Sequence, residues 1–457
     1  MTQFRLAIIA IVAVVGMACA SRTSTVIPIP ESPPETEAVQ EEPVAEPEPA
    51  EPEIVEIPLS SRDFSDLIAV APEVRAQPRL CWMPDKIAEA KSMLSGVTLH
   101  VGTDPIRYTE TRNGVRRTYR EPEKEYALAV LHRDSCEIEI ISAFKRGADL
   151  VPPEGWDIEV VERSNGIRWN LWNTEFRIVE PANAVVIGNV EPFARNVTSS
   201  RRVRTATGAT KLVRSTTRSV EYRQYVPYSR DLHSDLLVEI GEEYLQDLVA
   251  RAYALLRERK VPSRAVPGTD VADLPYLTPV MFERLPLIEQ MDLAEFLFEN
   301  ERVVERVHVL FATNLQDAFA LTCSSAGACG PYQFTDNGRK GTYTTIRERY
   351  PAARLNRDFT GGARDHLNVA MAAVLLHDNN LKLLVDTFGE SILKDPRLEE
   401  YLAALYNASP ARVIPAIRTA LAKKSADWSV HLPSRIKQET GGYIVKLRYL
   451  QERDAEQ

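Results

Sequence analysis

The spacing of apolar residues changes once along the chain, and this change divides the folded part into two regions. Several stretches between about residue 60 and residue 222 show a pattern with a period of two residues. These stretches include 127–131, 136–141, 156–161 and 185–187. This period places successive side chains on opposite faces of a strand, so it predicts a mostly β region. From His233 onward the apolar residues recur with a period of 3.6, which predicts helices.

The expected fold class is therefore α+β with several domains. A mostly β domain of unknown role covers residues 59–230, and an all-α domain covers residues 231–457. The expected helices are 235–259, 275–296, 302–320, 362–384, 397–407 and 411–422. Residues 201–225 are predicted to form a hairpin that turns at Thr207-Gly208, with many Arg on its faces. Such a ribbon could contact anionic wall polymer or lipid, but a solvated hairpin face is the favoured interpretation.

The N-terminus has the layout of a secretory signal, assigned to residues 1–19. Leu6 to Met17 form an apolar run after Arg5. This run is too short to span a bilayer, which needs roughly 20 residues, and it ends in small residues. The segment around Met17-Ala18-Cys19 resembles the lipobox of bacterial lipoproteins, which implies that Cys19 carries lipid. The alternative is ordinary cleavage after Ala20 without a lipid anchor.

Residues 20–58 form a Pro/Glu-rich segment that is expected to be a disordered linker. Between Ile27 and Pro58 the chain holds ten Glu and no Lys or Arg. At roughly 3.1 Å per residue, about 30 extended residues reach on the order of 90 Å. The linker also accounts for the formal net charge of -9, because the chain without these ten Glu carries about +1. A near-neutral folded part without a clustered basic groove argues against a nucleic-acid partner.

Cysteine and histidine usage bears on the compartment and on metal binding. If Cys19 is lipidated, four of the five cysteines remain in a compartment that permits disulfides. Cys323 could then pair with Cys329, and Cys81 with Cys136, although buried free thiols are the alternative. The seven His are scattered without an H-E-x-x-H motif, so no metal site is expected. No phosphate-binding or dinucleotide motif is present either, and no cofactor is expected.

Four short stretches of the helical region resemble the soluble lytic transglycosylase family, and they occur in the family's order. Residues 324–334, SSAGACGPYQF, look like its S-x-A-G-A-x-G-x-x-Q segment. Residues 402–410, LAALYNASP, are similar to L-A-A-Y-N-A-G-P, and residues 433–446 resemble P-x-E-T-x-x-Y-V-x-K. A turn at 260–262, followed by a helix that ends in LPLIE at 285–289, is similar to the family's helix that carries the catalytic Glu.

The resemblance implies a lysozyme-like domain that cleaves peptidoglycan between N-acetylmuramic acid and N-acetylglucosamine and leaves a 1,6-anhydro ring. The residues expected at the substrate are Ser325, Tyr332, Gln333, Tyr406, Asn407, Glu439 and Tyr443. The implied partners are peptidoglycan glycan strands and, through the lipid anchor, a membrane. The implied location is the periplasmic side of the outer membrane, or a soluble periplasmic or secreted form if Cys19 carries no lipid.

The identity of the catalytic acid depends on the register of the alignment. Aligned tightly backward from Gln333, the family's Glu position is occupied by Gln316, which has no acidic proton to donate, and Asp317 is one place out of step. The other register uses Glu289, with about thirty residues inserted before Ser324. We favour Glu289 because its local context matches the family. The alternative hypothesis is a peptidoglycan-binding lipoprotein on the same fold without catalytic activity.

Overall fold

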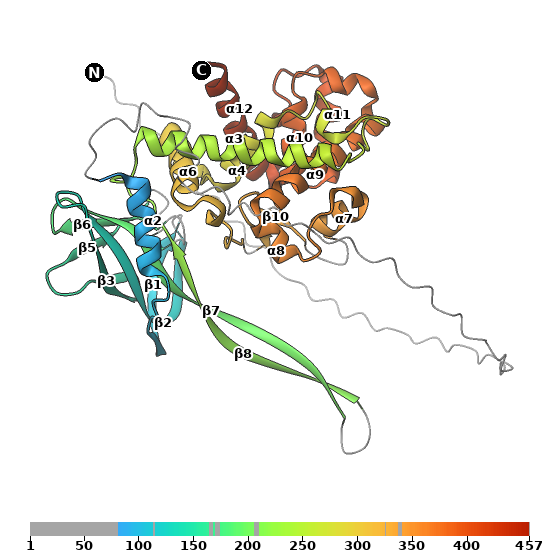
Figure 1. Cartoon of the computed structure of the whole chain (residues 1–457). Coiled ribbons are helices and arrows are strands. Elements are labelled where there is room, and N and C mark those ends of the chain that lie inside the picture. The colour runs from blue at the N-terminus through green and yellow to red at the C-terminus, as the bar shows by residue number, and fades with distance from the viewer. Residues whose placement is uncertain are drawn as a thin grey trace, which may run out of the picture. The chain divides into compact units, whose positions relative to one another are not determined.

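The computed structural model describes residues 81–456, apart from 113–114, 164–167, 170–173, 205–209, 325 and 337–340. In these residues a β region, from about residue 100 to residue 225, precedes a helical region (Figure 1). The predicted mixed α and β organisation is therefore confirmed at this level. The expected signal peptide with Cys19 and the expected linker lie outside the described residues. No helix within the described part of the chain has the length and apolar character needed to cross a membrane.

The β region consists of one large antiparallel sheet and a separate strand pair. The large sheet has the order β4-β3-β2-β7-β8, with β1 also paired to β2, and the separate pair is β5 with β6. The strands are β1 (Val101–Arg112), β2 (Val115–His132), β3 (Glu137–Arg146), β4 (Asp149–Val151), β5 (Asp157–Val160), β6 (Phe176–Glu180), β7 (Ala184–Arg204) and β8 (Thr210–Tyr225). The predicted hairpin of β7 and β8 is confirmed by its register, while its turn residues lie outside the described part.

A continuous run of buried residues along β2, 126–131, supplies both faces of this sheet with apolar side chains, because successive side chains of a strand point to opposite faces. Ala127, Ala129 and Leu131 pack into one core together with α2 (Met83–Leu94). Tyr126, Leu128 and Val130 pack on the other face with residues of β5 and β6. Both faces of the central strands are therefore covered.

Helix α2 was not predicted from the alternation pattern. It begins with Pro84 in its first turn and buries Ile87, Ala90 and Leu94, whose spacing places them on one face. Gly188 allows α2 to approach the sheet closely, because a Cβ at this position would lie 2.8 Å from Leu94 Cδ1.

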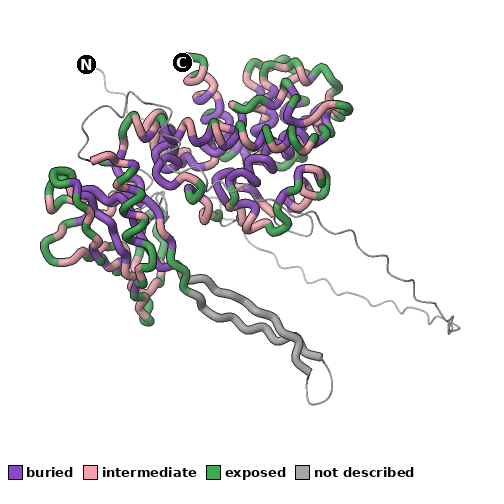
Figure 2. Tube along the Cα trace, viewed as in Figure 1, coloured by how far each residue is buried: buried purple, intermediate pink, exposed green. Residues whose placement is uncertain are grey.

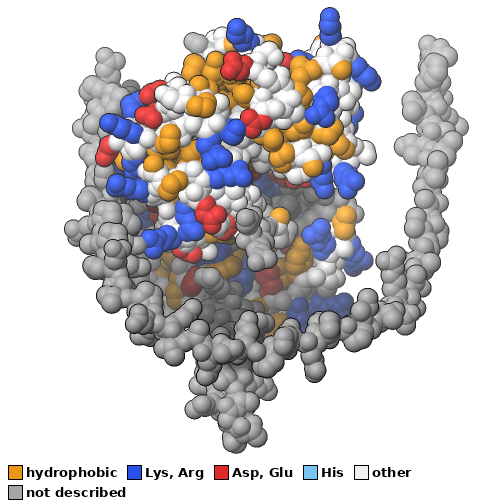
Figure 3. Space-filling view, turned by 90° about the vertical axis from the view of Figure 1, so that its right-hand side faces the viewer, with side chains coloured by type: hydrophobic (Ala, Val, Ile, Leu, Met, Phe, Trp, Pro, Cys, Tyr) orange, Lys and Arg blue, Asp and Glu red, His pale blue; other side chains and the backbone are white. Residues whose placement is uncertain are grey.

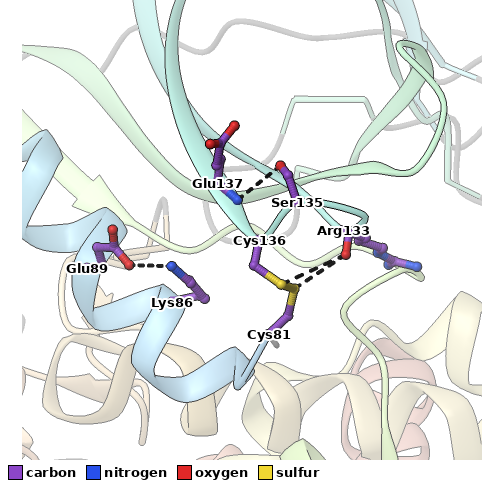
Figure 4. Close-up of a disulfide and its surroundings, with 7 residues drawn as sticks. All are labelled: Cys81, Lys86, Glu89, Arg133, Ser135, Cys136 and Glu137. Atoms are coloured by element: carbon purple, nitrogen blue, oxygen red, sulfur yellow. Dashed lines mark hydrogen bonds and ion pairs between the residues drawn. A yellow bond between two sulfur atoms is a disulfide. The ribbon is translucent and has the colours of Figure 1, made fainter. Parts of the chain in front are cut away.

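A disulfide between Cys81 and Cys136 joins the start of α2 to the turn between β2 and β3 (Figure 4). The second disulfide joins Cys323 to Cys329 within the helical region. Both are the pairings that the sequence suggested, and the alternative of buried free thiols is wrong for these four residues. In the chain-entropy account each crosslink stabilises the fold by restricting the unfolded chain.

The helical region surrounds one continuous hydrophobic core (Figure 2). Every residue of α9 from Val369 to Leu376 is buried, so this helix runs through the centre of the core. The helices are α3 (Asp235–Glu258), α4 (Pro279–Gln290), α5 (Leu293–Phe296), α6 (Asn300–Asn314), α7 (Thr342–Arg349), α8 (Phe359–Arg364), α9 (His366–Phe388), α10 (Leu398–Asn407), α11 (Pro410–Lys423) and α12 (Ser434–Glu456).

One predicted helix is split and another ends early, and the hydrogen bonds of a polar side chain mark both positions. The expected helix 275–296 is split at Met291, because the Asp292 side chain accepts hydrogen bonds from the next backbone amides and starts α5. The expected helix 302–320 ends at Asn314, which bonds with both backbone groups of Val226. The next residue, Leu315, has a φ of 51° and cannot continue the helix.

Candidate active site

The candidate site is built around Glu289, which lies in the last turn of α4. This helix begins at a Pro-containing first turn and ends at Gln290, after which the backbone of Met291 is extended. The C-terminal end of a helix carries a partial negative charge, so an ionised carboxylate is disfavoured there. The local structure of the chain therefore favours the protonated form of Glu289.

Two residues of α12 contact the end of α4. The Tyr443 hydroxyl donates a hydrogen bond to Glu289 Oε1 over 2.9 Å. Lys446, which is only 8 % exposed, donates from Nζ to the carbonyl oxygens of Ile288 at 2.9 Å and Met291 at 2.5 Å. Tyr443 and Lys446 are three positions apart, a spacing that places both side chains on the same face of the helix. The cation thereby neutralises the last carbonyls of α4 next to the carboxyl group.

Burial raises the pKa of Glu289 to about 7, since desolvation penalises the carboxylate. The hydrogen bond from Tyr443 and the positive charge of Lys446 lower it, and the negative charge of Glu439 raises it. In turn, burial lowers the pKa of Lys446 to about 8, against the raising effect of Glu289. The site therefore holds a carboxyl group with a raised pKa beside a basic group, which suits an acid that also acts as a base.

The loop that resembles the family's sugar-binding segment is joined to this helix end by Gln290. Its Nε2 donates to the carbonyl oxygen of Pro331 at 2.8 Å, with a longer contact of 3.3 Å to that of Gly330. The loop itself is closed by the disulfide of Cys323 and by a short antiparallel pair, β9 (Ala328–Cys329) with β10 (Phe334–Thr335). Glu289 and the loop are thus held together through adjacent residues of α4.

Gly330 is required by this arrangement. Its φ is +75°, and a Cβ would lie 1.8 Å from the carbonyl oxygen of Ala363. Gln333 also has a positive φ, 46°, and its Nε2 donates to the Gly330 oxygen at 2.8 Å. The Gln333 side chain therefore supports the loop through its amide nitrogen, while the residue remains partly exposed.

Tyr406 and Asn407 complete the site from the end of α10. The Tyr406 hydroxyl donates to the carbonyl oxygen of Tyr332 at 2.6 Å. Burial, followed by the negative charge of Glu289, raises the pKa of Tyr406 well above its usual value. Asn407 Oδ1 accepts a hydrogen bond from the Thr440 hydroxyl at 2.8 Å, and Glu439 beside it is exposed. The ends of α4, α10 and α12 and the loop therefore meet around one carboxyl group.

Tyr332 does not fit the expected role in substrate binding. Its side chain is 0 % exposed, and its hydroxyl donates to the carbonyl oxygen of Phe282 at 3.0 Å. A side chain enclosed in this way cannot touch a sugar, so its contribution is to hold the loop. Tyr443 is also buried, at 4 %, and it acts on Glu289. Ser325 lies outside the described residues.

The alternative acid positions lie elsewhere on the chain. Gln316 and Asp317 belong to a single 3-10 turn after α6, and both are exposed. Asp317 acts electrostatically on Lys91 and Tyr244, and neither residue is among the groups that influence Glu289. The carbonyl oxygen of the next residue, Ala318, accepts a hydrogen bond from Nε2 of His366 at the start of α9. Of the two registers, only that of Glu289 brings a carboxyl group to Tyr406 and Tyr443 in the described structure.

Lys446 and Gln290 contribute to the site without having been predicted from the sequence. Lys446 is the last residue of segment 433–446, which resembles the family's closing motif. Its position three residues after Tyr443 was the feature of the sequence from which a shared helix face could have been predicted. Gln290 directly follows Glu289, but sequence gives no indication that its amide bonds to a loop forty residues away. Among the described residues, no group of three or more His, Cys, Asp or Glu is arranged to hold a metal ion.

Comparisons with protein-family models, with curated proteins and with solved structures found no match for this chain.

Proposed function

We propose that this protein is a peptidoglycan lytic transglycosylase with a lysozyme-like helical domain and that Glu289 is its general acid and base. The observation that carries the proposal is the half-buried Glu289 carboxyl group, which accepts a hydrogen bond from Tyr443 at 2.9 Å and has its pKa raised to about 7. The resemblance of the segments that surround this carboxyl group to the transglycosylase family supplies the substrate class.

In the proposed reaction Glu289 acts twice. Its carboxylic acid first donates a proton to the glycosidic oxygen that links N-acetylmuramic acid to N-acetylglucosamine, and the bond to the anomeric carbon breaks. The resulting carboxylate then takes the proton of the muramoyl 6-hydroxyl while that oxygen attacks the anomeric carbon. The products are a 1,6-anhydro ring and a free N-acetylglucosamine end, and Glu289 is protonated again. Since the nucleophile comes from the substrate, the second carboxylate of an ordinary glycosidase is not needed.

The surrounding residues would support both protonation states. Tyr443 and Lys446 stabilise the carboxylate that forms after the first proton transfer, and burial favours the acid before it. Gln333, Asn407 and Glu439, which keep some exposure, would contact the sugars. Loss of either stabilising group should therefore affect the second step more than substrate binding.

Digestion of purified sacculi with mass spectrometry of the released fragments tests the proposal. The wild-type protein is expected to release muropeptides that carry 1,6-anhydro ends. Glu289→Gln removes the transferable proton and should lower this release at least about 10²-fold. Gln316→Ala is the matched control at the competing position and should retain activity. Binding of sacculi without 1,6-anhydro products would instead establish the non-catalytic alternative.

The export signal and the anchor belong to the same proposal. We infer that Cys19 is lipidated and that residues 20–58 tether the folded part to the periplasmic face of the outer membrane. Metabolic labelling with a fatty acid should give a labelled protein, and Cys19→Ser should remove the label. An unlabelled wild-type protein would leave the soluble periplasmic or secreted form.

A further inference from the structure

Two hairpin arms leave the β sheet, and the register shows that they leave it on the same side of β2. The first arm is β1 with the start of β2, residues 104–120, and the second is the part of β7 and β8 in residues 194–219. At Lys124, β2 pairs with β1 on one side and with β3 on the other. From Ala127 onward β7 takes the place of β1 opposite β3.

The direction of the strands places both tips beyond the same end of the sheet. Strands β1 and β7 both run antiparallel to β2. After Val190, β7 no longer pairs with β2 and continues with β8 toward the Val115 end of β2. Figure 1 shows β7 and β8 extending from the sheet as a two-stranded ribbon. From Val190 to Arg204 this ribbon is about 45 Å long at roughly 3.3 Å per residue.

Both arms are rich in arginine. Residues 194–219 contain seven basic residues and no acidic residue. In the first arm Arg107, Arg116, Arg117 and Arg120 are exposed, and none of the four makes an ion pair within the described part of the chain. The acids of this arm are Asp104 and Glu110, and Glu110 is opposite Arg117 in the register.

The first arm also places like charges directly opposite each other. Arg107 pairs in register with Arg120. Cross-strand pairs of like charge destabilise a hairpin in isolation, so this arrangement costs stability unless an anion compensates it.

The helical region differs from the arms. On the face shown in Figure 3, its Lys and Arg side chains are scattered among apolar, uncharged and acidic ones. The folded part as a whole is near neutral, so the positive charge of the arms is local.

We propose that the two arginine-rich arms together bind an anionic phospholipid surface. An extended surface with many charges can contact two separate arms at once, as a small ligand cannot. Each Lys or Arg held near an anionic membrane contributes to binding, and the contributions of the two arms add. The inference does not depend on catalysis by Glu289, because it concerns the other region of the chain and predicts no change in the reaction.

Co-sedimentation with lipid vesicles tests the proposal. The full chain is used with Cys19→Ser in every variant, so that no acyl chain is attached and the N-terminal apolar run contributes equally. Binding to phosphatidylcholine vesicles is compared with binding to vesicles that also contain about 30 % phosphatidylglycerol. The wild-type arms should bind the anionic vesicles, and about 0.5 M salt should remove most of this binding.

Three variants, each with four substitutions to Gln, locate the effect. The first-arm variant changes Arg107, Arg116, Arg117 and Arg120. The second-arm variant changes Arg201, Arg202, Arg204 and Lys211. The control variant changes four exposed basic residues of the helical region, Arg412, Arg418, Lys423 and Lys424. Each arm variant should lower the affinity for anionic vesicles by at least about tenfold, while the control changes it by less than about twofold.

Several outcomes would overturn the proposal. Equal binding to neutral and anionic vesicles would show that the charge is irrelevant. An equal loss in the control variant would show that only net charge counts. Binding to sacculi or DNA that depends on the arms, without binding to anionic vesicles, would assign the arms to another polyanion. Thermal unfolding of each variant is measured first, and only variants with the wild-type transition are compared.

Discussion

Replacing Lys446 by Met removes a buried positive charge beside Glu289 and should raise the pKa of that carboxyl group. Lys446 Nζ lies 2.9 Å from the carbonyl oxygen of Ile288, the residue that precedes Glu289. For a separation of roughly 6–8 Å between the charges and an effective dielectric constant near 20, Coulomb's law gives about 2–3 kcal/mol. This energy corresponds to an increase of about 1.5–2 pH units in the pKa of Glu289, which starts at about 7.

The proposed reaction makes this change visible in the pH dependence of product release. The rate should fall as the pH rises through the pKa of Glu289, because the acid loses its proton. In Lys446→Met this alkaline limb should lie about 1.5–2 pH units higher than in the wild type. Lys437→Met is the matched control, since Lys437 is exposed on the same helix and should leave the limb in place. An alkaline limb that does not move in a folded Lys446→Met protein would refute the reasoning.

The increase in the pKa of Glu289 in Lys446→Met can also be measured without substrate, from the stability of the fold. An ionised Glu289 destabilises the fold, because its pKa is higher in the folded state than in the unfolded chain. Its stabilising contribution as an acid is present at low pH and is lost as the pH rises to the folded pKa. The stability of Lys446→Met is compared with that of the double variant Lys446→Met/Glu289→Gln, and the stability of the wild type with that of Glu289→Gln. The loss of stability caused by ionisation of Glu289 should end at a higher pH in the first pair. The variant also leaves two carbonyl oxygens without their donor, at a cost of about 2–4 kcal/mol.

Three further predictions concern the same regions. Tyr443→Phe removes a hydrogen bond that favours the carboxylate, so the alkaline limb of the pH profile should rise by about one pH unit while KM changes little. Glu289→Gln should leave stability unchanged at acidic pH and increase it by up to about 3 kcal/mol above pH 7, as measured by urea unfolding across pH. Asn314→Ala leaves the backbone N–H and C=O of Val226 unpaired and should cost about 2–4 kcal/mol in the same assay; a loss below about 0.5 kcal/mol would contradict this.

The pattern of apolar residues predicted the main elements because burial alone determines them. Residues 127–131 are all apolar and pack on two faces of β2, and the prediction of a strand there is confirmed. The period of 3.6 over 235–259 likewise predicted α3, which ends one residue earlier. Helix α2 was missed because it is short and lies in a region where alternation dominates. The ends of α4 and α6 were missed because side chains distant in sequence, or a local cap, terminate them.

The order of the short motifs indicated which segments meet, but it left the catalytic acid open between two registers. The local context favoured Glu289, but the tight register, which needs no insertion, placed Gln316 at the same position of the family pattern. Their surroundings differ in the structure: Glu289 accepts a hydrogen bond from Tyr443, and Gln316 lies on an exposed turn. The burial of Tyr332 was likewise invisible in the sequence, since a Tyr within a binding motif looks the same whether its ring faces the ligand or the core.

Sequence by itself determined the two-region organisation, the helical and strand periods and the set of motif residues. These follow from local spacing, which fixes the face on which a residue lies. Tertiary structure alone decided that Lys446 neutralises the end of α4, that Gln290 holds the motif loop against it, and that two basic arms leave one end of the sheet. Each of these depends on desolvation, charge or strand register between segments that are far apart in the chain, and such energies have no expression in the spacing of neighbouring residues.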